Sequence, residues 1–199
     1  MFITFEGGDG AGKSTAVQSV ATALASNGIR AIVTRQPGDG PLGPSIRQLL
    51  LHREMPALSE LFLFLADRNQ HVERIVRPAL ERGDVVLCDR YGDSTVAYQG
   101  YARGLDVALL KELNGLATGG LCPDLTLLLD LRPEVGLGRL ESKDRLDKEA
   151  LDFHRRIREG FLALAAEDPG RWRVIDASRP ASEVSAECVE AVMSRIECR

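Results

Sequence analysis

The sequence predicts an α/β protein of three layers, with a five-stranded parallel sheet between two layers of helices. Short apolar runs rich in β-formers alternate along the chain with longer segments of helical periodicity. Such alternation is typical of parallel sheets joined by right-handed crossovers. The run LTLLLDL at 125–131 is almost continuously apolar, as expected of a strand covered on both faces. At 199 residues, the chain is predicted to form one domain, residues 1–199.

Each predicted element has its own signal in the chain. The expected strands are apolar and short: 2–6, 30–35, 84–89, 125–131 and 172–176. The expected helices are longer: 13–27, 44–52, 58–82, 105–117, 147–167 and 181–197. Asn27-Gly28 is a good C-cap pair, and Gly83 ends the long helix. Because ligands of open parallel sheets bind beyond the carboxyl ends of the strands, the segments after these strands should line one crevice.

Composition and charge exclude several classes of function. The net charge of −4 argues against a dedicated nucleic-acid binder, although it leaves room for a local basic patch. The chain has no signal-peptide pattern and no apolar run long enough to span a bilayer, so no membrane partner is expected. The cysteines are scattered, which favours reduced thiols and a cytoplasmic location over a disulfide framework or zinc site. They are Cys88, Cys122, Cys188 and Cys198.

The segment FEGGDGAGKST at 5–15 carries the strongest motif. Gly7, Gly12, Lys13 and Ser14 fit the phosphate-loop pattern between a predicted strand and a predicted helix, which indicates a P-loop NTPase-type fold. Lys13 should reach the β- and γ-phosphates, and the Ser14 hydroxyl should ligate Mg²⁺. The predicted nucleotide-binding residues are Gly7, Gly8, Asp9, Gly10, Ala11, Gly12, Lys13, Ser14 and Thr15.

Two further residues follow the third predicted strand, in VVLCDRY. An acid at this strand end, here Asp89, commonly assists Mg²⁺ in this class of fold. The alternative is that Asp89 and Arg90 form only a surface ion pair.

The rest of the chain narrows the class of phosphate-loop protein. A GTPase switch needs the guanine-reading N-K-x-D, and no asparagine of this chain begins that motif. A large motor or transporter ATPase needs further domains, for which 199 residues leave no room. A small acceptor for a phosphoryl group is therefore favoured. A nucleotide-dependent switch without a second substrate is the contrasting hypothesis, and it predicts no acceptor-dependent release of ADP.

The long predicted helix carries an arginine in an apolar stripe. Phe64 and Arg68 are four residues apart, so they share a helix face. An aromatic ring beside a planar guanidinium can stack on a flat heterocycle and donate to its edge. From the residues alone, packing of Phe64 in the core and a structural ion-pair role for Arg68 are the favoured interpretation.

Several segments together resemble the bacterial thymidylate kinases, which transfer the γ-phosphoryl group of ATP to dTMP. They occur in that family's order and spacing and cover roughly residues 2–180 of the chain. They are FEGGDGAGKST, TRQPG (34–38), LFLFLADRNQHVERIVRPAL (61–80), DRYGDSTVAYQG (89–100), PDLTLLLDLRPEVGLGR (123–139) and DRLDKEALDF (144–153). The resemblance implies a nucleoside monophosphate kinase domain with a short mobile lid at about 139–149, using ATP and Mg²⁺, and a homodimer.

The resemblance also implies roles for single residues. Asp9 would approach the sugar 3′-hydroxyl of dTMP with the metal nearby, so the metal set becomes Ser14, Asp89 and Asp9. Arg35 and Arg90 would clamp the acceptor phosphate, as guanidinium forks suit that work. Phe64 would stack on thymine and Arg68 would donate to a base carbonyl. The wall of the deoxynucleoside pocket would include Ser94, Thr95, Tyr98 and Gln99, with the Tyr98 ring excluding a 2′-hydroxyl. A helix-cap or surface role stays open for Ser94 and Gln99.

The expected lid is rich in charge, with Arg139, Lys143 and Arg145. A solvated loop is the ordinary interpretation of such a run. In the bacterial subtype that this chain resembles, the loop position filled here by Gly10 also lacks arginine, and a lid arginine supplies the charge. The resemblance therefore implies that Arg145 first, and Arg139 second, stabilises the transferring group. The expected catalytic residues are thus Lys13, Arg90, Arg145, Arg139 and Asp9.

The chain departs from the family pattern at one position in the motif after the second strand. The family usually reads R-E-P-G, whereas here Gln36 stands between Arg35 and Pro37, so the glutamate's role is not carried over. A cis bond before Pro37 would match the family. No histidine is needed as a base, and His52, His71 and His154 are expected to be incidental surface residues. Another small nucleoside monophosphate or deoxynucleoside kinase on the same scaffold remains the alternative function.

Overall fold

The computed structural model describes residues 1–142 and 144–197, so Lys143 and Cys198 lie outside the described residues. The described residues form one five-stranded sheet in which every neighbouring pair is parallel, with the order β2-β3-β1-β4-β5. This confirms the predicted fold class. The strands are β1 (Phe2–Glu6), β2 (Ala31–Arg35), β3 (Val85–Asp89), β4 (Leu125–Asp130) and β5 (Trp172–Asp176).

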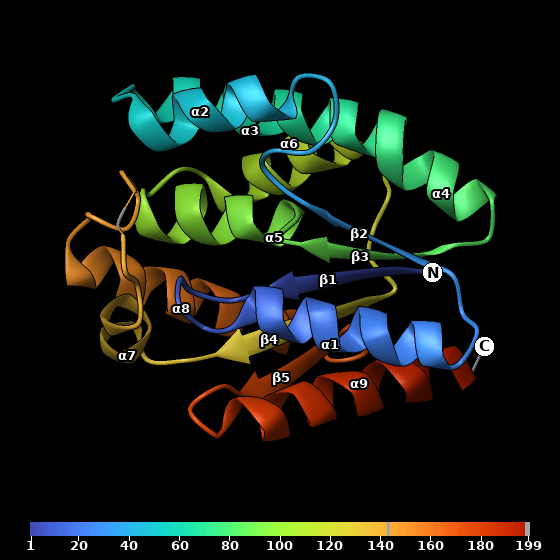
Figure 1. Ribbon diagram of the computed structural model, residues 1–199. Coiled ribbons are helices and arrows are strands. Elements are labelled where there is room, and N and C mark those ends of the chain that lie inside the picture. Colours follow the sequence, from blue (N-terminus) through green and yellow to red (C-terminus); the bar gives the residue numbers. More distant parts are fainter. Residues whose placement is uncertain (143, 198–199) are drawn as a thin grey trace.

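Helices connect the strands and cover both faces of the sheet (Figure 1). The first group is α1 (Lys13–Ser26), α2 (Gly43–His52), α3 (Ala57–His71), the π-helical turn η1 (Val72–Val76) and α4 (Arg77–Glu81). The second group is α5 (Gly92–Thr95), the π-helical turn η2 (Val96–Ala102), α6 (Val107–Thr118), α7 (Pro133–Gly138), α8 (Leu151–Glu167) and α9 (Ala181–Glu197). None of the helices in the described part of the chain is long and apolar enough to cross a membrane.

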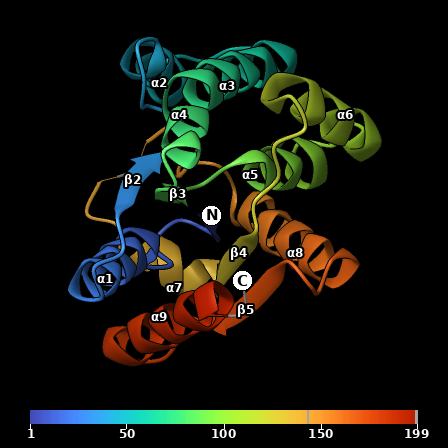
Figure 2. The same cartoon turned by 90° about the vertical axis from the view of Figure 1, so that its right-hand side faces the viewer.

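Figure 2 shows helices on both sides of the sheet, and the strand residues pack alternately against these two layers. Ile3 and Phe5 pack in the cluster that includes α1 and α9, whereas Phe2 packs on the opposite face with η1 and α4. A third cluster joins η2, α6 and α8 over the β4 and β5 side of that opposite face. Since successive strand residues point to opposite faces, burial on both sides explains the nearly continuous apolar runs.

Most predicted boundaries agree with the structure within about two residues, and the departures have local causes. The helix expected at 147–167 begins only at Leu151, because the Asp144 carboxylate accepts from the backbone N–H groups of Leu146 and Asp147 and forms a turn. The long helix expected at 58–82 runs from 57 to 81, but it widens to a π-helical turn before Pro78. Residues 133–138 and the full segment 92–102 are helical without having been predicted so.

The topology brings the carboxyl ends of β1, β2 and β3 together. Phe5 pairs with Asp89 in the register of β1 and β3, and Arg35 pairs with the same Asp89 in that of β2 and β3. The loop after β1 therefore lies beside the segment after β3. The Gln36–Pro37 bond at the end of β2 is cis, as the resemblance implied. The crevice predicted from the strand order is thus assembled from segments far apart in the chain.

Candidate active site

The loop between β1 and α1 has a backbone that requires glycine. Gly7, Gly10 and Gly12 have φ values of 139°, 72° and 94°, in the left-handed half of backbone space that glycine enters without strain. A Cβ on Gly10 would lie 2.0 Å from the carbonyl oxygen of Gly136 in α7. The loop ends at the N-terminus of α1, where Lys13 is the first helical residue. This geometry fits a phosphate cradle at a helix N-terminus.

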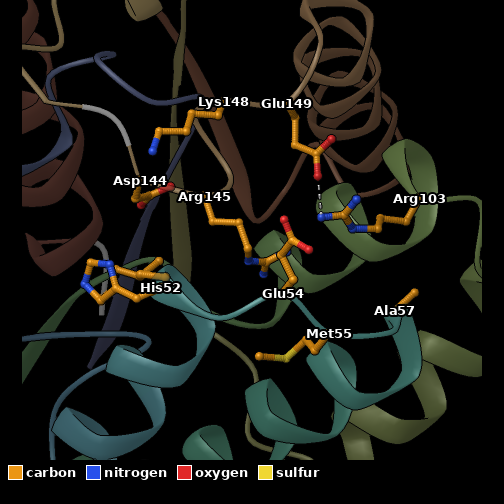
Figure 3. Close-up of a pocket in the computed structure, with 10 residues that line it drawn as sticks. His52, Glu54, Met55, Ala57, Arg103, Asp144, Arg145, Lys148 and Glu149 are labelled. Atoms are coloured by element: carbon orange, nitrogen blue, oxygen red, sulfur yellow. Dashed lines mark ion pairs between the residues drawn. The ribbon is translucent and has the colours of Figure 1, made fainter.

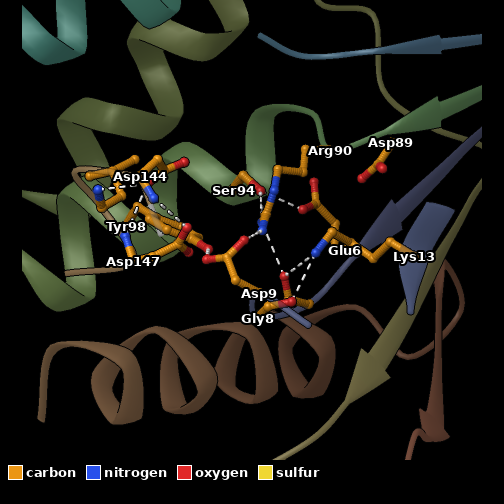
Figure 4. A network of polar contacts seen from close by, with 12 residues as sticks. Glu6, Gly8, Asp9, Lys13, Asp89, Arg90, Ser94, Tyr98, Asp144 and Asp147 are labelled. Carbon is orange, nitrogen blue, oxygen red and sulfur yellow. Dashed lines mark hydrogen bonds and ion pairs between the residues drawn. The ribbon is translucent and has the colours of Figure 1, made fainter. Parts of the chain in front are cut away.

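Lys13 lies across the mouth of this loop. Its Nζ donates to the carbonyl oxygens of Gly7 at 3.1 Å and Gly8 at 2.8 Å (Figure 4). Burial lowers the pKa of the ammonium to about 8, with the nearby Arg90 guanidinium acting in the same direction, while Asp9 and Asp89 oppose the shift. The amine therefore keeps its proton over most of the neutral range and can meet a phosphate as a cation.

Ser14 and Asp89 come together beside the loop. The Ser14 hydroxyl donates to Asp89 Oδ2 at 3.1 Å, and neither side chain is buried. A hydroxyl and a carboxylate fit Mg²⁺, which takes few protein oxygens and completes its octahedron with water and phosphate. No group of three or more His, Cys, Asp or Glu side chains within residues 1–142 and 144–197 could hold a metal by itself. The chemistry of the pair thus fits a metal bound jointly with a nucleotide.

Asp9 faces away from that pair and towards the other half of the crevice. Its Oδ1 accepts from Arg90 Nη2 at 2.5 Å, and its Oδ2 accepts from the Tyr98 hydroxyl at 2.9 Å. Burial alone would raise the pKa of this carboxyl, but Arg90 and Lys13 outweigh burial and lower the pKa to about 2. Asp9 is therefore a fixed anion joined to Arg90 and Tyr98, and it is not brought onto Ser14 and Asp89.

Arg90 occupies the centre of the site. It is the one non-glycine residue with positive φ (67°) in the described part of the chain, a conformation that costs energy unless its surroundings hold it. Its Nη1 donates to the Gly7 carbonyl at 3.0 Å and to Ser94 Oγ at 3.3 Å. The guanidinium also lies 5.2 Å from the centroid of the Tyr98 ring. The strained backbone and the contacts together aim this cation at the crevice.

Glu6 is a buried acid that was not predicted as part of the site. Its carboxylate accepts from Ser94 Oγ at 2.6 Å and from the backbone N–H of Tyr91 at 2.8 Å. Burial, with the Asp93 charge nearby, raises its pKa to about 7. Glu6 anchors the segment that carries Arg90. Its position at the last residue of β1, before the phosphate loop, was the only available signal.

A pocket opens between this network and the long helix. Phe64 and Arg68 both line it, as their predicted common face requires. Gln36, Arg47, Ser94, Thr95, Tyr98 and Gln99 also line it, together with Asp9 and Arg90. The structure thus collects the predicted acceptor residues except Arg35, which does not line the pocket. Its side chain is 58% exposed, and its Nε lies 3.7 Å from Asp39 Oδ1. Arg47 is the pocket arginine that the sequence did not indicate.

Arg68 is buried and already has many partners. Its Nε donates to Gln36 Oε1 at 3.0 Å, and its Nη1 donates to Thr95 Oγ1 at 2.9 Å and Asn114 Oδ1 at 2.6 Å. Its Nη2 donates to the Tyr91 carbonyl at 3.1 Å. Four such bonds make Arg68 a structural centre of the pocket wall. The structural role of Arg68 therefore does not conflict with a role in binding the base.

Gln99 and Arg145 meet at another buried acid, Glu60. Gln99 Nε2 donates to Glu60 Oε1 at 2.8 Å, and Arg145 Nη2 donates to Glu60 Oε2 at 2.5 Å. Arg145 also donates to the Leu50 carbonyl at 3.0 Å. It therefore lies over a second cavity with Arg103 and Glu149, on the α2 and α3 side of the lid (Figure 3). In this arrangement Arg145 does not touch the phosphate loop.

Arg139 is the lid arginine that lies on the loop. Its Nη1 donates to the Gly10 carbonyl at 3.2 Å, and it borders a hollow with Gly12, Thr15 and Arg179. Arg179, after β5, was not predicted, because nothing in its local sequence distinguishes it from other surface arginines. Arg139 therefore lies on the phosphate-loop side of the site, and Arg145 lies on the α2 and α3 side.

Two of the three histidines are not on the surface. His71 is 0% exposed and His154 is 5% exposed, so the expectation of surface positions was wrong for both. His71 faces inward from the end of α3, and its ring nitrogens contact Thr34 and Gln36. His52 is exposed, as predicted. The helix pattern did not reveal the burial of His71, because burial at the end of α3 depends on the contact with β2.

Comparison with known proteins identifies the family. A family model described as thymidylate kinase matches residues 5–188. The chain belongs to the thymidylate kinase family. A curated thymidylate kinase of Desulfovibrio desulfuricans is 50% identical over 212 residues, covering 100% of this chain and 98% of the relative. One of Thermomicrobium roseum is 52% identical, covering 98% and 95%.

A solved structure supports the same family at the level of the fold. The crystal structure of thymidylate kinase from Ehrlichia chaffeensis matches with a TM-score of 0.79 and 35% sequence identity. The match covers 96% of this chain and 98% of that one. The α/β fold with its phosphate loop is therefore that of a thymidylate kinase, a P-loop NTPase fold. The resemblance inferred from the motifs is confirmed.

Proposed function

We propose that this protein transfers the γ-phosphoryl group of ATP to dTMP and releases dTDP and ADP. The observation that carries the proposal is the position of Asp9. This residue belongs to the phosphate loop, yet both of its carboxylate oxygens bond residues of the neighbouring pocket, Arg90 and Tyr98. A donor cradle and an acceptor pocket thus share one loop, as direct transfer between two nucleotides requires.

The pocket chemistry favours a deoxynucleoside monophosphate as acceptor. Phe64 supplies an aromatic ring and Arg68 a planar donor in the pocket wall, which suits a flat base with a carbonyl edge. Arg90 and Arg47 line the pocket and present guanidinium groups for the acceptor phosphate, and the exposed Arg35 lies at the end of β2. The Tyr98 ring, 6% exposed and bonded to Asp9, occupies the space beside the sugar. A 2′-hydroxyl would compete for that space.

On the donor side, the loop would bind the triphosphate and Lys13 would reach its outer phosphates. Ser14 and Asp89 would hold Mg²⁺, which neutralises phosphate charge when bound. The nucleophile is an acceptor phosphate oxygen, already ionised at neutral pH, so no residue needs to remove a proton from it. The chain's own task is to align two anions and offset their charge.

The lid would complete the site by excluding water and adding a cation. Arg139 and Arg145 both remain candidates, and Arg145 would have to leave Glu60 to reach the loop. Arg139→Ala and Arg145→Ala distinguish them: the residue that stabilises the transferring group lowers kcat while the KM of both substrates stays nearly constant. A change confined to the KM of dTMP would instead give that arginine a role in acceptor binding.

Further features of the proposal concern assembly and location. We expect one catalytic domain with a lid at about 139–149, working in the cytoplasm as a homodimer. Leu58 and Phe62 on α3 and Leu109 and Leu116 on α6 are large exposed apolar side chains, and these two helices pack together. Leu61 on α3 and Val72 at the start of η1 are buried in the core and are therefore not part of this surface. Phe62→Asp should shift the sedimentation coefficient to that of a monomer, and no shift would remove this surface from the interface.

The test of function is a panel of acceptors with ATP and Mg²⁺, read as acceptor-dependent formation of ADP. The panel contains dTMP, dUMP, AMP, CMP, GMP and thymidine. We expect dTMP to give the highest kcat/KM, with dUMP next, since one methyl group distinguishes them by only about 1–3 kcal/mol. Preference for thymidine or for a ribonucleotide would favour another kinase of the same fold, and ADP formation independent of every acceptor would contradict both.

A further inference from the structure

A chain of buried hydrogen bonds runs behind the acceptor pocket, from Arg68 to Asp39. Arg68 Nε donates to Gln36 Oε1 at 3.0 Å. Gln36 Nε2 lies 2.7 Å from His71 Nδ1, and His71 Nε2 lies 2.6 Å from Thr34 Oγ1. Thr34 Oγ1 donates to Asp39 Oδ2 at 2.8 Å. Arg68, Gln36, His71 and Thr34 are each no more than 4% exposed, so these bonds are shielded from water.

The donors and acceptors permit only one direction for this chain. Arginine can only donate, so the oxygen of the Gln36 amide must face Arg68 and its NH₂ group must face His71. His71 Nδ1 must then accept, which leaves its proton on Nε2 and the ring neutral. Nε2–H donates to Thr34, whose own hydrogen goes to Asp39. Every link is therefore fixed by the fact that arginine stands at one end and a carboxylate at the other.

The two ends of this row of hydrogen bonds, Arg68 and Asp39, lie at different parts of the acceptor site. Arg68 is in the wall where the base is expected. Asp39 Oδ2 accepts from the backbone N–H of Arg35 at 3.0 Å, and Asp39 Oδ1 lies 3.7 Å from Arg35 Nε, so this end holds the expected phosphate clamp. Gln36 lines the pocket, whereas Thr34 and His71 are not among the described residues that line it. Thr34 and His71 would thus act on the substrate only through the residues to which they are hydrogen-bonded.

We propose that Gln36, His71 and Thr34 are positioning residues that hold Arg68 and the Asp39–Arg35 pair in one fixed geometry for dTMP. The proposal rests on the proposed function in naming dTMP as the ligand. Glutamine at position 36 is essential to it, because a glutamate would accept from Arg68 but could not donate to a neutral His71. The identity of residue 36 and the protonation of His71 are therefore coupled in this chain.

The first test observes His71 directly and needs no activity. Nitrogen NMR of protein labelled in its histidine rings, with His71→Gln for assignment, reports which ring nitrogen carries the proton. We expect a neutral ring protonated on Nε2 at neutral pH. A ring protonated on Nδ1, or a charged ring, would overturn the chain as described, whatever the protein phosphorylates.

The second test measures KM and kcat for both substrates in Thr34→Val and Gln36→Glu. Thr34→Val keeps the side-chain shape and removes the hydroxyl that joins His71 to Asp39. We expect the KM of dTMP to rise about tenfold in each variant, as for the loss of one buried hydrogen bond. The KM of ATP and the kcat should change by no more than about twofold.

Controls separate positioning from loss of structure or of function. Gln48→Glu makes the same chemical change on the exposed face of α2, and it should leave both KM values unchanged. Thermal unfolding of each variant checks that it is folded, and Thr34→Val carries the test if Gln36→Glu does not fold. Equal changes in the KM of dTMP and ATP, or no change in Thr34→Val, would contradict the proposal. A wild-type protein inactive on dTMP would instead contradict the proposed function, while the NMR result would still stand.

Discussion

The acceptor half and the donor half of this site are built differently. In the acceptor half, Arg68, Asp9 and Arg90 are each held by two or more side-chain hydrogen bonds. In the donor half, Ser14 and Arg139 are exposed, and each side chain makes one hydrogen bond within residues 1–142 and 144–197. The acceptor half is therefore already organised, whereas the donor half has groups free to adapt. This difference suggests that selectivity for the acceptor depends on a preformed pocket, and that phosphoryl transfer depends on the triphosphate and the lid.

The largest effect is expected from the donor half. Lys13→Ala should lower kcat by at least about 10²-fold, because it removes a cation aimed at the transferring group. The thermal midpoint should change little, since the Lys13 bonds are to loop carbonyls. Steady-state kinetics and thermal unfolding measure the two quantities. Near-normal turnover would remove the phosphate loop from catalysis.

In the acceptor half, Arg68→Ala should affect both stability and binding. Removing the guanidinium leaves buried acceptors on Gln36, Thr95 and Asn114 without their donor, so unfolding should require roughly 3 kcal/mol less free energy. In protein that remains folded, the KM of dTMP should rise far more than that of ATP. Denaturant titration and kinetics with each substrate varied in turn measure these. Equal effects on both KM values would show that Arg68 has no particular role in the acceptor pocket.

A pH dependence of stability should come from Glu6. Its folded pKa of about 7 lies above its ordinary value of 4.5, so between these pH values the native state holds a proton that the unfolded state has released. Stability therefore decreases as pH rises through this window, by about 3 kcal/mol from this one group. Glu6→Gln should remove that slope when unfolding is compared with wild type from acid to neutral pH. Parallel pH curves would show that the buried carboxyl is not protonated in the native state.

The smallest expected change tests the contact between the two halves. Tyr98→Phe removes the hydroxyl bond to Asp9 and keeps the ring, so dTMP binding should weaken by about 1 kcal/mol. Replacement of Tyr98 by a smaller residue should further relax discrimination against ribonucleotides. The ratio of kcat/KM for deoxy- and ribonucleotide acceptors measures this. A ratio unchanged in both variants would confine Tyr98 to packing.

What could be predicted from the sequence depended on whether a feature is local in the chain or arises from tertiary contacts. The strands, the phosphate loop and the segment after β3 were predictable because each is recognised from a short stretch of sequence. Gly12 and Lys13 belong to a motif between a predicted strand and a predicted helix, and Asp89 lies at the end of a predicted strand. The family resemblance favoured the base-binding role of Phe64 and Arg68 and added Tyr98.

The buried polar residues that support the site were not predictable. Glu6 accepts from Ser94, and Glu60 accepts from Gln99. His71 contacts Gln36. Each of these contacts arises through packing between elements far apart in the chain.

Errors in the sequence-based predictions have the same origin. His71 and His154 were expected on the surface because the reaction needs no histidine as a base, yet packing against other elements buries them. The start of α8 was placed too early because the Asp144 turn competes with helix formation. The ranking of Arg145 before Arg139 came from the resemblance alone, because their contacts with Glu60 and Gly10 are tertiary.

Calorimetric titration of dTMP in the absence of ATP and Mg²⁺ tests the central claim most directly. If the acceptor half is preformed, dTMP should bind at one site per chain with a dissociation constant within about tenfold of its KM, and Arg68→Ala should weaken that binding. Binding of dTMP only after ATP has been added would contradict the claim, because the acceptor pocket would then be assembled by the donor.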